Sequence, residues 1–599
     1  MSKPGNLAWL AAAASLLGAA CDREPPKAVP AAPEAGGDAA AQSAEWDGFV
    51  SAWIDRYFEF NPPAGVNAGR HEFDGRLPDF SEQGIADTTT WLRESRQQAQ
   101  RFSAESLDER ELFERDHLLA AADGLLFNLV TSNFLHTSPV FYSFFTSPST
   151  YITVEYAPLA ERMRAYTSYA ESLPGFLQHM QENLSTPLAR PYVETALGIF
   201  GGLSGYLAND VPEVFSEVAD PEFEQAFAKA NNGAVAALDE LVAWLESQQA
   251  DAHDDYALGA DRFREMLRQT EGVDIGLAEL KAAGQADLER NLAALDQACE
   301  AFAPGETEAA CIAKAEADKP EGGPVEGARR QLEELRAFLD AGRLVSIPGT
   351  EAARVEEAPP YARFNLAYIE IPGPYEKKLP SIYYIAPPDP EWAEAEQQAY
   401  IPGEAELLFI SVHEVWPGHF LHYLHANRAP SEFGRLFQTY SFTEGWAHYT
   451  EEMMWDAGLR DGDPQTHIGQ LTNALLRNVR FLSAIGLHTE GMSVEESQRM
   501  FEEHAFQDAG NAAQQARRGT FDPGYLNYTL GKLMILKLRD DWTAGRREAW
   551  PEFHDEFLSY GGPPVPLVRR AMLGDDYAGD PGLLAPAAAR PPAAGAAAP

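Results

Sequence analysis

The segment His413-Glu414-Val415-Trp416-Pro417-Gly418-His419 constrains the local fold more than any other stretch of this 599-residue chain. It is similar to the helical metal-binding pattern His-Glu-x-x-His, with Pro-Gly inserted before the second histidine. Histidines four residues apart lie about 40° apart on one helix face. A separation of six residues puts them about 120° apart on an ideal helix. Either the helix is broken between Val415 and His419 so that both histidines reach one metal, or this is no metal site.

A second helical segment supplies candidates for a third ligand. Thr443-Glu444-Gly445-Trp446-Ala447-His448-Tyr449-Thr450-Glu451-Glu452 begins thirty residues after His413, and Glu444, His448, Glu451 and Glu452 share one face at helical spacing. We predict Glu444 as the ligand, because Gly445 and Trp446 would suit close packing against the first helix. His448, one turn later, is predicted to support the ligands or bind substrate, with a competing ligand as the alternative.

Further candidate site residues lie elsewhere in the chain. Arg518, Tyr525 and Tyr528 form a patch near the C-terminus, and tyrosine hydroxyls and guanidinium groups can stabilise an oxyanion or a substrate carboxylate. Tyr384 and His488 are additional candidates for substrate binding. Tyrosines and histidines are also common in packed cores, and for His488 that alternative carries equal weight.

In combination and order, these segments resemble the bacterial domain-of-unknown-function 885 family, whose members are regarded as relatives of zinc peptidases. The resemblance spans most of residues 45–575. The matching stretches are His413–His419, Glu444–Ala447, Gly486-Leu487-His488, and Arg518 followed by Pro523-Gly524 and Tyr528–Gly531.

The resemblance implies a site and a fold. It implies one zinc ion on His413, His419 and Glu444, with Glu414 activating water and Tyr528 acting as a transition-state donor. It also implies a mainly α-helical, gluzincin-like fold with a deep cleft. The chain departs from the family pattern at Phe420, His422 and Tyr525, where the family tends to have His, Gln and Gln. These departures are expected to affect substrate specificity more than metal binding.

Charge excludes some classes of partner. The chain has 91 Asp and Glu residues against 46 Lys and Arg, a formal charge of −45. Because nucleic-acid binding needs a basic surface that neutralises phosphates, nucleic acid is not an expected partner. Adsorption to anionic lipid through the protein surface is disfavoured for the same reason.

The N-terminal sequence predicts export from a bacterial cell. One early positive charge at Lys3 is followed by an apolar stretch and by Gly18-Ala19-Ala20-Cys21. This pattern predicts a lipoprotein signal over residues 1–21 with lipid on Cys21; the alternative is plain secretory cleavage. The lipid would be the sole membrane contact of a periplasmic or cell-envelope protein. The two remaining cysteines, Cys299 and Cys311, are predicted to form a disulfide in that oxidising environment.

Periodicity predicts the organisation of the rest. Residues 22–44 and 583–599, rich in Ala, Pro and Gly, are expected to be a linker and a disordered tail. Apolar residues at three- and four-residue spacing predict a helical lobe over 45–345 and a metal-binding lobe over 346–582. Two short β-branched and aromatic stretches, within 364–371 and 381–386, predict a small hairpin beside the metal helix.

Three functions are compatible with these patterns. The first is an exported zinc peptidase acting on short peptides, as a dipeptidase, carboxypeptidase or oligopeptidase. The second is a surface lipoprotein that binds a partner and keeps a degenerate or structural metal. The third is a zinc amidohydrolase with a non-peptide substrate. Glu414 favours catalysis, because a structural metal has no use for a base beside its ligand. The sequence does not predict an oligomeric state.

Overall fold

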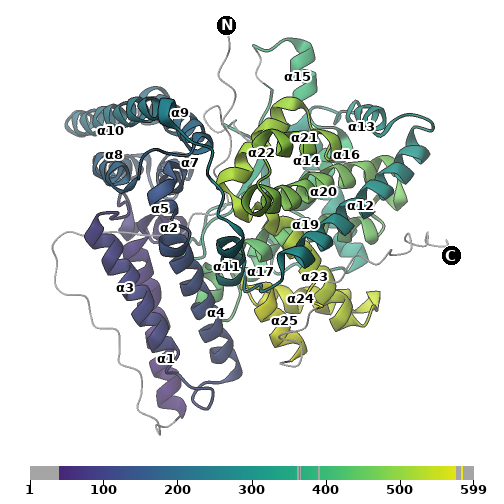
Figure 1. Ribbon diagram of the computed structural model, residues 1–599, viewed down its shortest axis with the longest axis horizontal. Helices are drawn as coiled ribbons and strands as arrows, with labels where there is room; N and C mark the ends of the chain where they lie inside the picture. The colour runs from purple at the N-terminus through teal and green to yellow at the C-terminus, as the bar shows by residue number, and fades with distance from the viewer. Residues whose placement is uncertain (1–38, 360–362, 364–365, 389–390, 575–581, 585–599) are drawn as a thin grey trace. The chain divides into compact units, whose positions relative to one another are not determined.

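The computed structural model describes residues 39–359, 363, 366–388, 391–574 and 582–584. The chain forms two units, one of residues 1–256 with 372–379 and the other of residues 257–371 with 380–599 (Figure 1). Both are built mainly from α-helices, as predicted. The boundary between them follows Tyr256 and does not lie at the predicted position 345.

The difference in boundary has a physical cause in the second unit. Helix α12 (Leu277–Phe302) packs along α20 (Pro464–Ile485), and α14 (Pro324–Gly342) packs against α16 (Glu404–Glu414). Asp287 of α12 is fully buried and pairs with Lys532, whose Nζ lies 2.6 Å from its Oδ2. Residues 257–345 therefore belong to the same unit as residues 380–574, because these long-range contacts join them.

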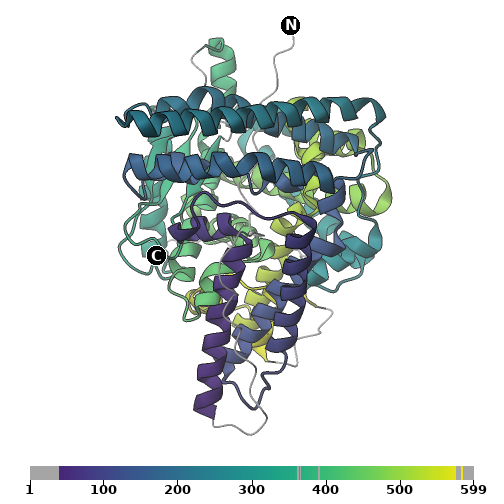
Figure 2. The same ribbon diagram turned by 90° about the vertical axis from the view of Figure 1, so that its left-hand side faces the viewer.

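All the named elements in the described residues of the first unit are helices. Long helices α8, α9 and α10 lie side by side (Figure 2), and Tyr166 of α8 donates a buried hydrogen bond to Asn231 of α10. The elements of this unit are α1 (Ala39–Phe60), α2 (Pro62–Ala68), η1 (His71–Phe73), α3 (Glu82–Ala99), α4 (Glu109–Leu126), η2 (Phe127–Thr131), α5 (Phe134–Thr137), α6 (Pro139–Ser143), α7 (Ser149–Thr153), α8 (Leu159–Asn183), α9 (Arg190–Val214), α10 (Pro221–Gln248) and η3 (Gln249–Asp251).

Two details of this unit bear on the predicted segments. Helix α1 begins at Ala39, so residues 39–44 are helical and the predicted linker is wrong there. Most of that linker, Cys21 and nearly all of the predicted tail lie outside the described residues.

Residues Glu109–Thr137 are long and apolar enough for a membrane span by length and composition alone. They also bury polar groups such as Glu114, whose Oε2 accepts a 2.8 Å hydrogen bond from Trp46, which is typical of a core helix.

The second unit carries the candidate site. Besides α12, α14, α16 and α20, its helices are α11 (Ala260–Thr270), α13 (Glu308–Glu316), α15 (Glu394–Tyr400), α17 (His419–Ala426), α18 (Glu432–Leu436), α19 (Tyr440–Asp456), η5 (Leu459–Gly462), η6 (Gly486–Glu490), α21 (Val494–His504), α22 (Ala509–Phe521), η7 (Pro523–Leu526), α23 (Asn527–Thr543), η8 (Arg547–Ala549), α24 (Trp550–Ser559) and α25 (Val565–Leu573). A disulfide between Cys299 and Cys311 joins α12 to α13.

A small sheet lies beside α16, the helix that carries His413, where the hairpin is predicted. Strands β2 (Ala367–Glu370) and β3 (Ile382–Ile385) are antiparallel, and β1 (Arg354–Glu357) pairs with β3 in parallel, giving the order β1-β3-β2. The Tyr383 hydroxyl lies 3.3 Å from Ser411 Oγ, which connects the central strand to α16. Tyr384 is on the opposite face of that strand, in a cluster with Ala358 and Ala386.

Two glycines let α19 and α23 cross without intervening side chains. A Cβ added at Gly445 would lie 2.5 Å from Gly531 Cα, and one at Gly531 would lie 1.9 Å from the carbonyl oxygen of Ser441. Gly445 therefore packs on α23, and the sequence-based prediction that it packs against the helix carrying His413 is wrong. The close crossing brings Glu444 and Tyr528, which lie near these glycines in the chain, to the same region.

Candidate metal centre

The helix that carries His413 and Glu414 ends at Glu414, and a new helix begins at His419. Val415 leaves the helical region with φ −125° and ψ −73°. The Gly418 amide donates to the Val412 carbonyl at 2.9 Å, which turns the chain tightly around the end of α16. The predicted break between Val415 and His419 is confirmed.

Glycine is required at the turn because another backbone segment lies against it. A Cβ at Gly418 would lie 1.8 Å from the His413 carbonyl oxygen and 2.5 Å from that of Val412. Trp446 supports the turn from the next helix, since its Nε1 donates to the Pro417 carbonyl at 2.9 Å. The Pro-Gly insertion thus re-aims His419 toward His413, and the ring centroids of the two histidines are 4.8 Å apart.

Three potential ligand atoms converge at this turn. One Glu444 oxygen, Oε2, lies 3.3 Å from His413 Nε2 and 3.3 Å from His419 Nε2. The ligand atoms of the three residues all lie within 4.8 Å of one another. Bonds of about 2.0–2.1 Å at tetrahedral angles separate two zinc ligands by about 3.3–3.4 Å. The donor types, and the two distances from Glu444 to the histidines, are therefore compatible with a divalent metal ion such as zinc held by these three residues.

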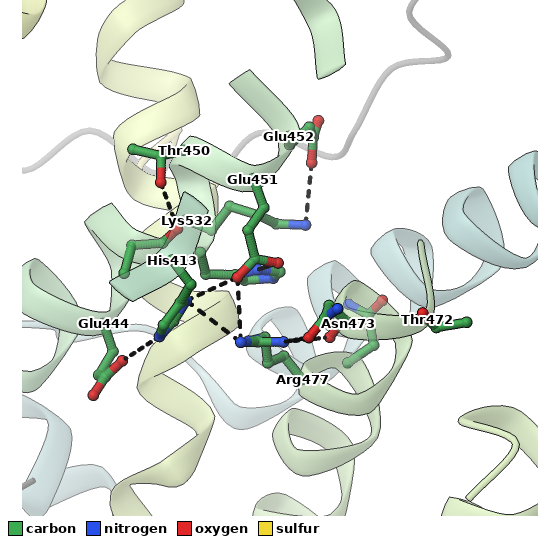
Figure 3. A network of polar contacts seen from close by, with 12 residues as sticks. His413, Glu444, Thr450, Glu451, Glu452, Thr472, Asn473, Arg477 and Lys532 are labelled. Carbon is green, nitrogen blue, oxygen red and sulfur yellow. Dashed lines mark hydrogen bonds and ion pairs between the residues drawn. The ribbon is translucent and has the colours of Figure 1, made fainter. Parts of the chain in front are cut away.

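A buried carboxylate orients the first histidine (Figure 3). His413 Nδ1 lies 2.8 Å from Glu451 Oε1, and this oxygen lies 3.2 Å from an Arg477 nitrogen. Glu451 Oε1 is placed to accept a proton from His413 Nδ1, while Nε2 of the same ring faces Glu444. In many metal sites a carboxylate accepts the Nδ1 proton of a histidine ligand, and Glu451 occupies the corresponding position relative to His413.

The electrostatics of the group favour a cation. Burial alone would lower the pKa of His413, but hydrogen bonds to Glu444 and Glu451 raise it to about 9. Burial opposes ionisation of Glu444, yet His419 and His413 hold its pKa well below the usual range. Oxygens that stabilise a proton on an imidazole nitrogen would equally stabilise a metal cation at that point.

Glu414 and Tyr528 border the triad. Burial raises the pKa of the Glu414 carboxyl, Glu444 adds to the rise, and His419 and His413 oppose it. The Tyr528 ring lies nearly parallel to that of His413, with centroids 6.3 Å apart. Burial, followed by the charge of Glu444, raises the pKa of Tyr528, which keeps its hydroxyl protonated as a hydrogen-bond donor.

Arg518 contacts Tyr440, and Tyr440 in turn packs against Tyr528. Its guanidinium donates to the Tyr440 hydroxyl at 2.9 Å and to Asp522 at 2.9 Å. The Tyr440 ring meets the Tyr528 ring edge-on at 5.6 Å. The structure thus brings Arg518 and Tyr528 together, as the sequence patch predicts.

The other predicted substrate-binding residues form hydrogen bonds and packing contacts in the protein interior. The Tyr525 hydroxyl donates to Ser483 at 2.8 Å, and the two His488 ring nitrogens contact the Leu258 amide and the Gly519 carbonyl. His448 is fully buried, with Nδ1 3.3 Å from Glu451 Oε2. Together with Tyr384, these residues have contacts typical of packing, and their placement gives no support for a role in substrate binding.

The additional histidine at 422 does not join the triad. Its Nε2 bonds the Gly561 carbonyl at 2.6 Å, and burial lowers its pKa to about 3, so the ring is neutral. His425 contacts the Ser346 carbonyl at 2.8 Å. Both therefore stabilise the packing around α17.

Sequence reasoning assigned no role to Glu451, Arg477, Arg480 or Tyr440. Glu451 is two helical turns after Glu444 and so on the same face, which is a usable signal. Arg477 and Arg480 interrupt the apolar run Ala474-Leu475-Leu476-Arg477-Asn478-Val479-Arg480-Phe481-Leu482, and buried arginines are uncommon unless they serve a partner. That these arginines lie beside the triad could be recognised only from the folded structure.

The comparisons with known proteins agree with this architecture. A structure of a proposed lipoprotein of unknown function from Shewanella oneidensis is similar over 88% of this chain and 99% of its own, with a TM-score of 0.75 and 21% identity. A proposed lipoprotein from Colwellia psychrerythraea is similar over 85% and 95%, with a TM-score of 0.69 and 15% identity. At these identities the likeness concerns the fold.

A search of curated proteins gives no match. The model of one family does match, over residues 62–572, and its description is "Bacterial protein of unknown function (DUF885)". That range contains the triad, Glu414, Glu451 and Tyr528. The chain belongs to the DUF885 family of bacterial proteins.

Proposed function

We propose that this protein is a zinc-dependent peptidase of the gluzincin type that hydrolyses short peptides. The observation that carries the proposal is the 3.3 Å spacing of Glu444 Oε2 from both histidine Nε2 atoms, next to a further carboxylate at Glu414. Two histidines around a glutamate base, with a ligand glutamate on a following helix, are the elements of that class. A purely structural metal would need no base.

Different residues of the protein would carry out different steps of the hydrolysis. Zinc on His413, His419 and Glu444 would polarise the scissile carbonyl and lower the pKa of the attacking water. Glu414, whose pKa burial raises, would take the proton from that water and pass it to the leaving amine. Glu451 and Arg477 keep His413 in the tautomer that presents Nε2.

Tyr528 is suited to stabilise the negative charge that develops on the carbonyl oxygen. Its ring is held by His413 on one side and by the guanidinium group of Arg480, 5.1 Å from the ring centroid. A held, protonated hydroxyl needs no reorganisation during the reaction. The short-peptide substrate and the deep cleft are part of the same proposal, by analogy with helical peptidases.

We place the enzyme at the bacterial cell envelope, attached through lipid on Cys21. The N-terminal pattern before Cys21 and the likeness to two proposed lipoproteins support this location. A disulfide between Cys299 and Cys311 agrees with an oxidising compartment.

Metal removal tests the proposed function. We expect the purified protein to hold about one zinc ion and to cleave members of a synthetic peptide mixture. A chelator should lower the rate more than about a hundredfold, and added Zn²⁺ should restore it, because the attacking water depends on the metal. Mg²⁺, which prefers oxygen ligands, is the control and should not restore activity. Undiminished hydrolysis by the metal-free protein would contradict the proposal, as would a chain that takes up no zinc when zinc is supplied.

A further inference from the structure

Glu271 is a buried carboxylate that joins the beginnings of two helices of the second unit. It directly follows α11 and is 2% exposed. Its Oε2 accepts a 3.0 Å hydrogen bond from the Ser441 amide on α19, and its Oε1 accepts a 3.1 Å hydrogen bond from Asn527 Nδ2 on α23. The two oxygens of one side chain therefore hold two separate helices, each in its first turn.

The bond to Ser441 caps α19. The first amides of a helix have no partner inside that helix, and the side chain of the N-cap residue usually accepts a hydrogen bond from one of them. The N-cap of α19 is Thr439, whose hydroxyl donates instead to the Pro563 carbonyl at 3.2 Å. Glu271, which is distant in the chain, supplies the acceptor, and its negative charge suits the N-terminal end of the helix dipole.

Capping alone does not require a buried carboxylate. Burial raises the pKa of Glu271 to about 7, although its hydrogen bonds from Ser441 oppose the rise. A serine or asparagine at the N-cap would serve α19 without burying a charge. An ionised carboxylate differs from such a cap because both of its oxygens are acceptors. It can therefore serve the Ser441 amide and the Asn527 side chain at the same time, which an amide of the same shape cannot.

The two bonded residues are neighbours of the proposed catalytic groups. Ser441 is three residues, less than one turn, before Glu444 on α19, and Asn527 directly precedes Tyr528 on α23. The Ser441 carbonyl oxygen also lies against α23 at the crossing where the two helices meet through glycine. Glu271 thus joins α19 and α23 beside this crossing, which sets the position of Tyr528 relative to Glu444.

We propose that Glu271 is a positioning residue, which fixes the Tyr528 hydroxyl relative to Glu444 by joining the first turns of α19 and α23. The inference rests on the proposed function, in which Tyr528 stabilises the charge on the carbonyl oxygen. A donor that acts in the transition state must be held in place beforehand, because reorganisation during the reaction lowers the rate. Loss of one of the two hydrogen bonds lets α23 shift relative to α19, which should lower kcat without changing KM.

A carboxyl group with a pKa of about 7 changes its charge within the range of an enzyme assay. Ionisable side chains close to Glu271, Ser441 or Asn527 in the chain, or on η6 beside α11, are Glu265, Arg268, Asp274, Tyr440, Glu444, His488, Glu490, Asp522, Tyr525, Tyr528 and Lys532. Burial raises the pKa of Tyr440 and Tyr528 above the usual tyrosine value, and it lowers the pKa of His488 to about 4. Partners of opposite charge hold the pKa of Glu265 and of Glu444 below the usual range.

The pH dependence of one variant tests the inference. Glu271→Gln replaces one acceptor oxygen with an amide NH₂ group, so one of the two donors loses its partner. At about pH 9 we expect kcat of the zinc-loaded variant to be about tenfold below that of the wild type, with KM and zinc content unchanged. At about pH 5 the wild-type carboxyl is protonated and also has one acceptor and one donor, so the two rates should agree within about twofold. The ratio of the two rates cancels the pH effects of Glu414 and of zinc binding, which both proteins share.

Further variants show whether the effect acts through Tyr528. In Tyr528→Phe the hydroxyl is absent, so adding Glu271→Gln should lower kcat by no more than about twofold. Asn527→Ala removes the other end of the bridge and should show the same loss of kcat and the same dependence on Tyr528, which keeps the test available if Glu271→Gln does not fold. Glu265→Gln is the matched control, because Glu265 lies on α11 and pairs with Arg268 of the same helix. Its kcat should equal that of the wild type at both pH values.

Two results would overturn the inference and leave the proposed function standing. One is a ratio of wild type to Glu271→Gln that is the same at both pH values. The other is an undiminished effect of Glu271→Gln when Tyr528 is already phenylalanine. Failure of the zinc-loaded wild type to cut any peptide would instead count against the proposed function, and the inference would fall with it.

Discussion

Glu414→Gln is expected to lower kcat/KM for peptide hydrolysis by about a thousandfold while zinc content stays at the wild-type level. The amide keeps the size of the side chain but cannot accept the proton of the attacking water. The ligand atoms belong to His413, His419 and Glu444, so the substitution leaves them in place. The measurement is peptide turnover together with metal content by mass spectrometry.

Glu406→Gln is the matched control for this variant. Glu406 is on the same helix two turns earlier, and burial, assisted by Glu316, raises its pKa to about 7. An amide there should leave turnover near the wild-type rate. Retained activity in Glu414→Gln would contradict the role of this carboxylate as base. Zinc without turnover in the wild type itself would favour the alternative of a binding lipoprotein with a structural metal.

Gly418→Ala is expected to abolish tight zinc binding. The added methyl group would lie 1.8 Å from the His413 carbonyl oxygen, and its three nearest atoms all belong to the backbone. The turn must therefore open, which moves His419 relative to His413. A displacement of about 1 Å at such a site costs on the order of a hundredfold, so we expect zinc affinity and turnover to fall together by at least that factor.

The control for this substitution is Gly276→Ala in the same unit. A Cβ at Gly276 meets no atom within 4 Å, and its φ of −65° suits alanine. Zinc affinity, measured by competition with a chelator, should be unchanged there. If Gly418→Ala bound zinc as tightly as the wild type, the tight turn could not be what brings the two histidines together.

Local sequence signals predicted much of the site. Pro417-Gly418 after an apolar helix predicted the break, and helical spacing predicted that Glu444 and Glu451 share a face. The short aromatic stretches predicted β2 and β3. These features depend on near neighbours in the chain, which is why the pattern of residue types was sufficient.

Long-range contacts were not predictable in the same way. Gly445 packs on Gly531 of α23, eighty-six positions later, and residue types alone do not show which helix a glycine faces. The packing of α12 along α20, together with the buried ion pair of Asp287 with Lys532, places residues after Tyr256 in the second unit. His488 turned out to be a histidine with both ring nitrogens bonded inside the fold, a state its sequence context leaves open.

The position of zinc in crystals of the zinc-loaded protein tests the central claim most directly. Anomalous scattering recorded at the zinc absorption edge identifies the ion independently of any assay of activity. We predict one strong peak in this region, about 2.0–2.2 Å from His413 Nε2, His419 Nε2 and a Glu444 oxygen. No peak at that point, or a zinc ion held instead by His422 or His448, would contradict the account.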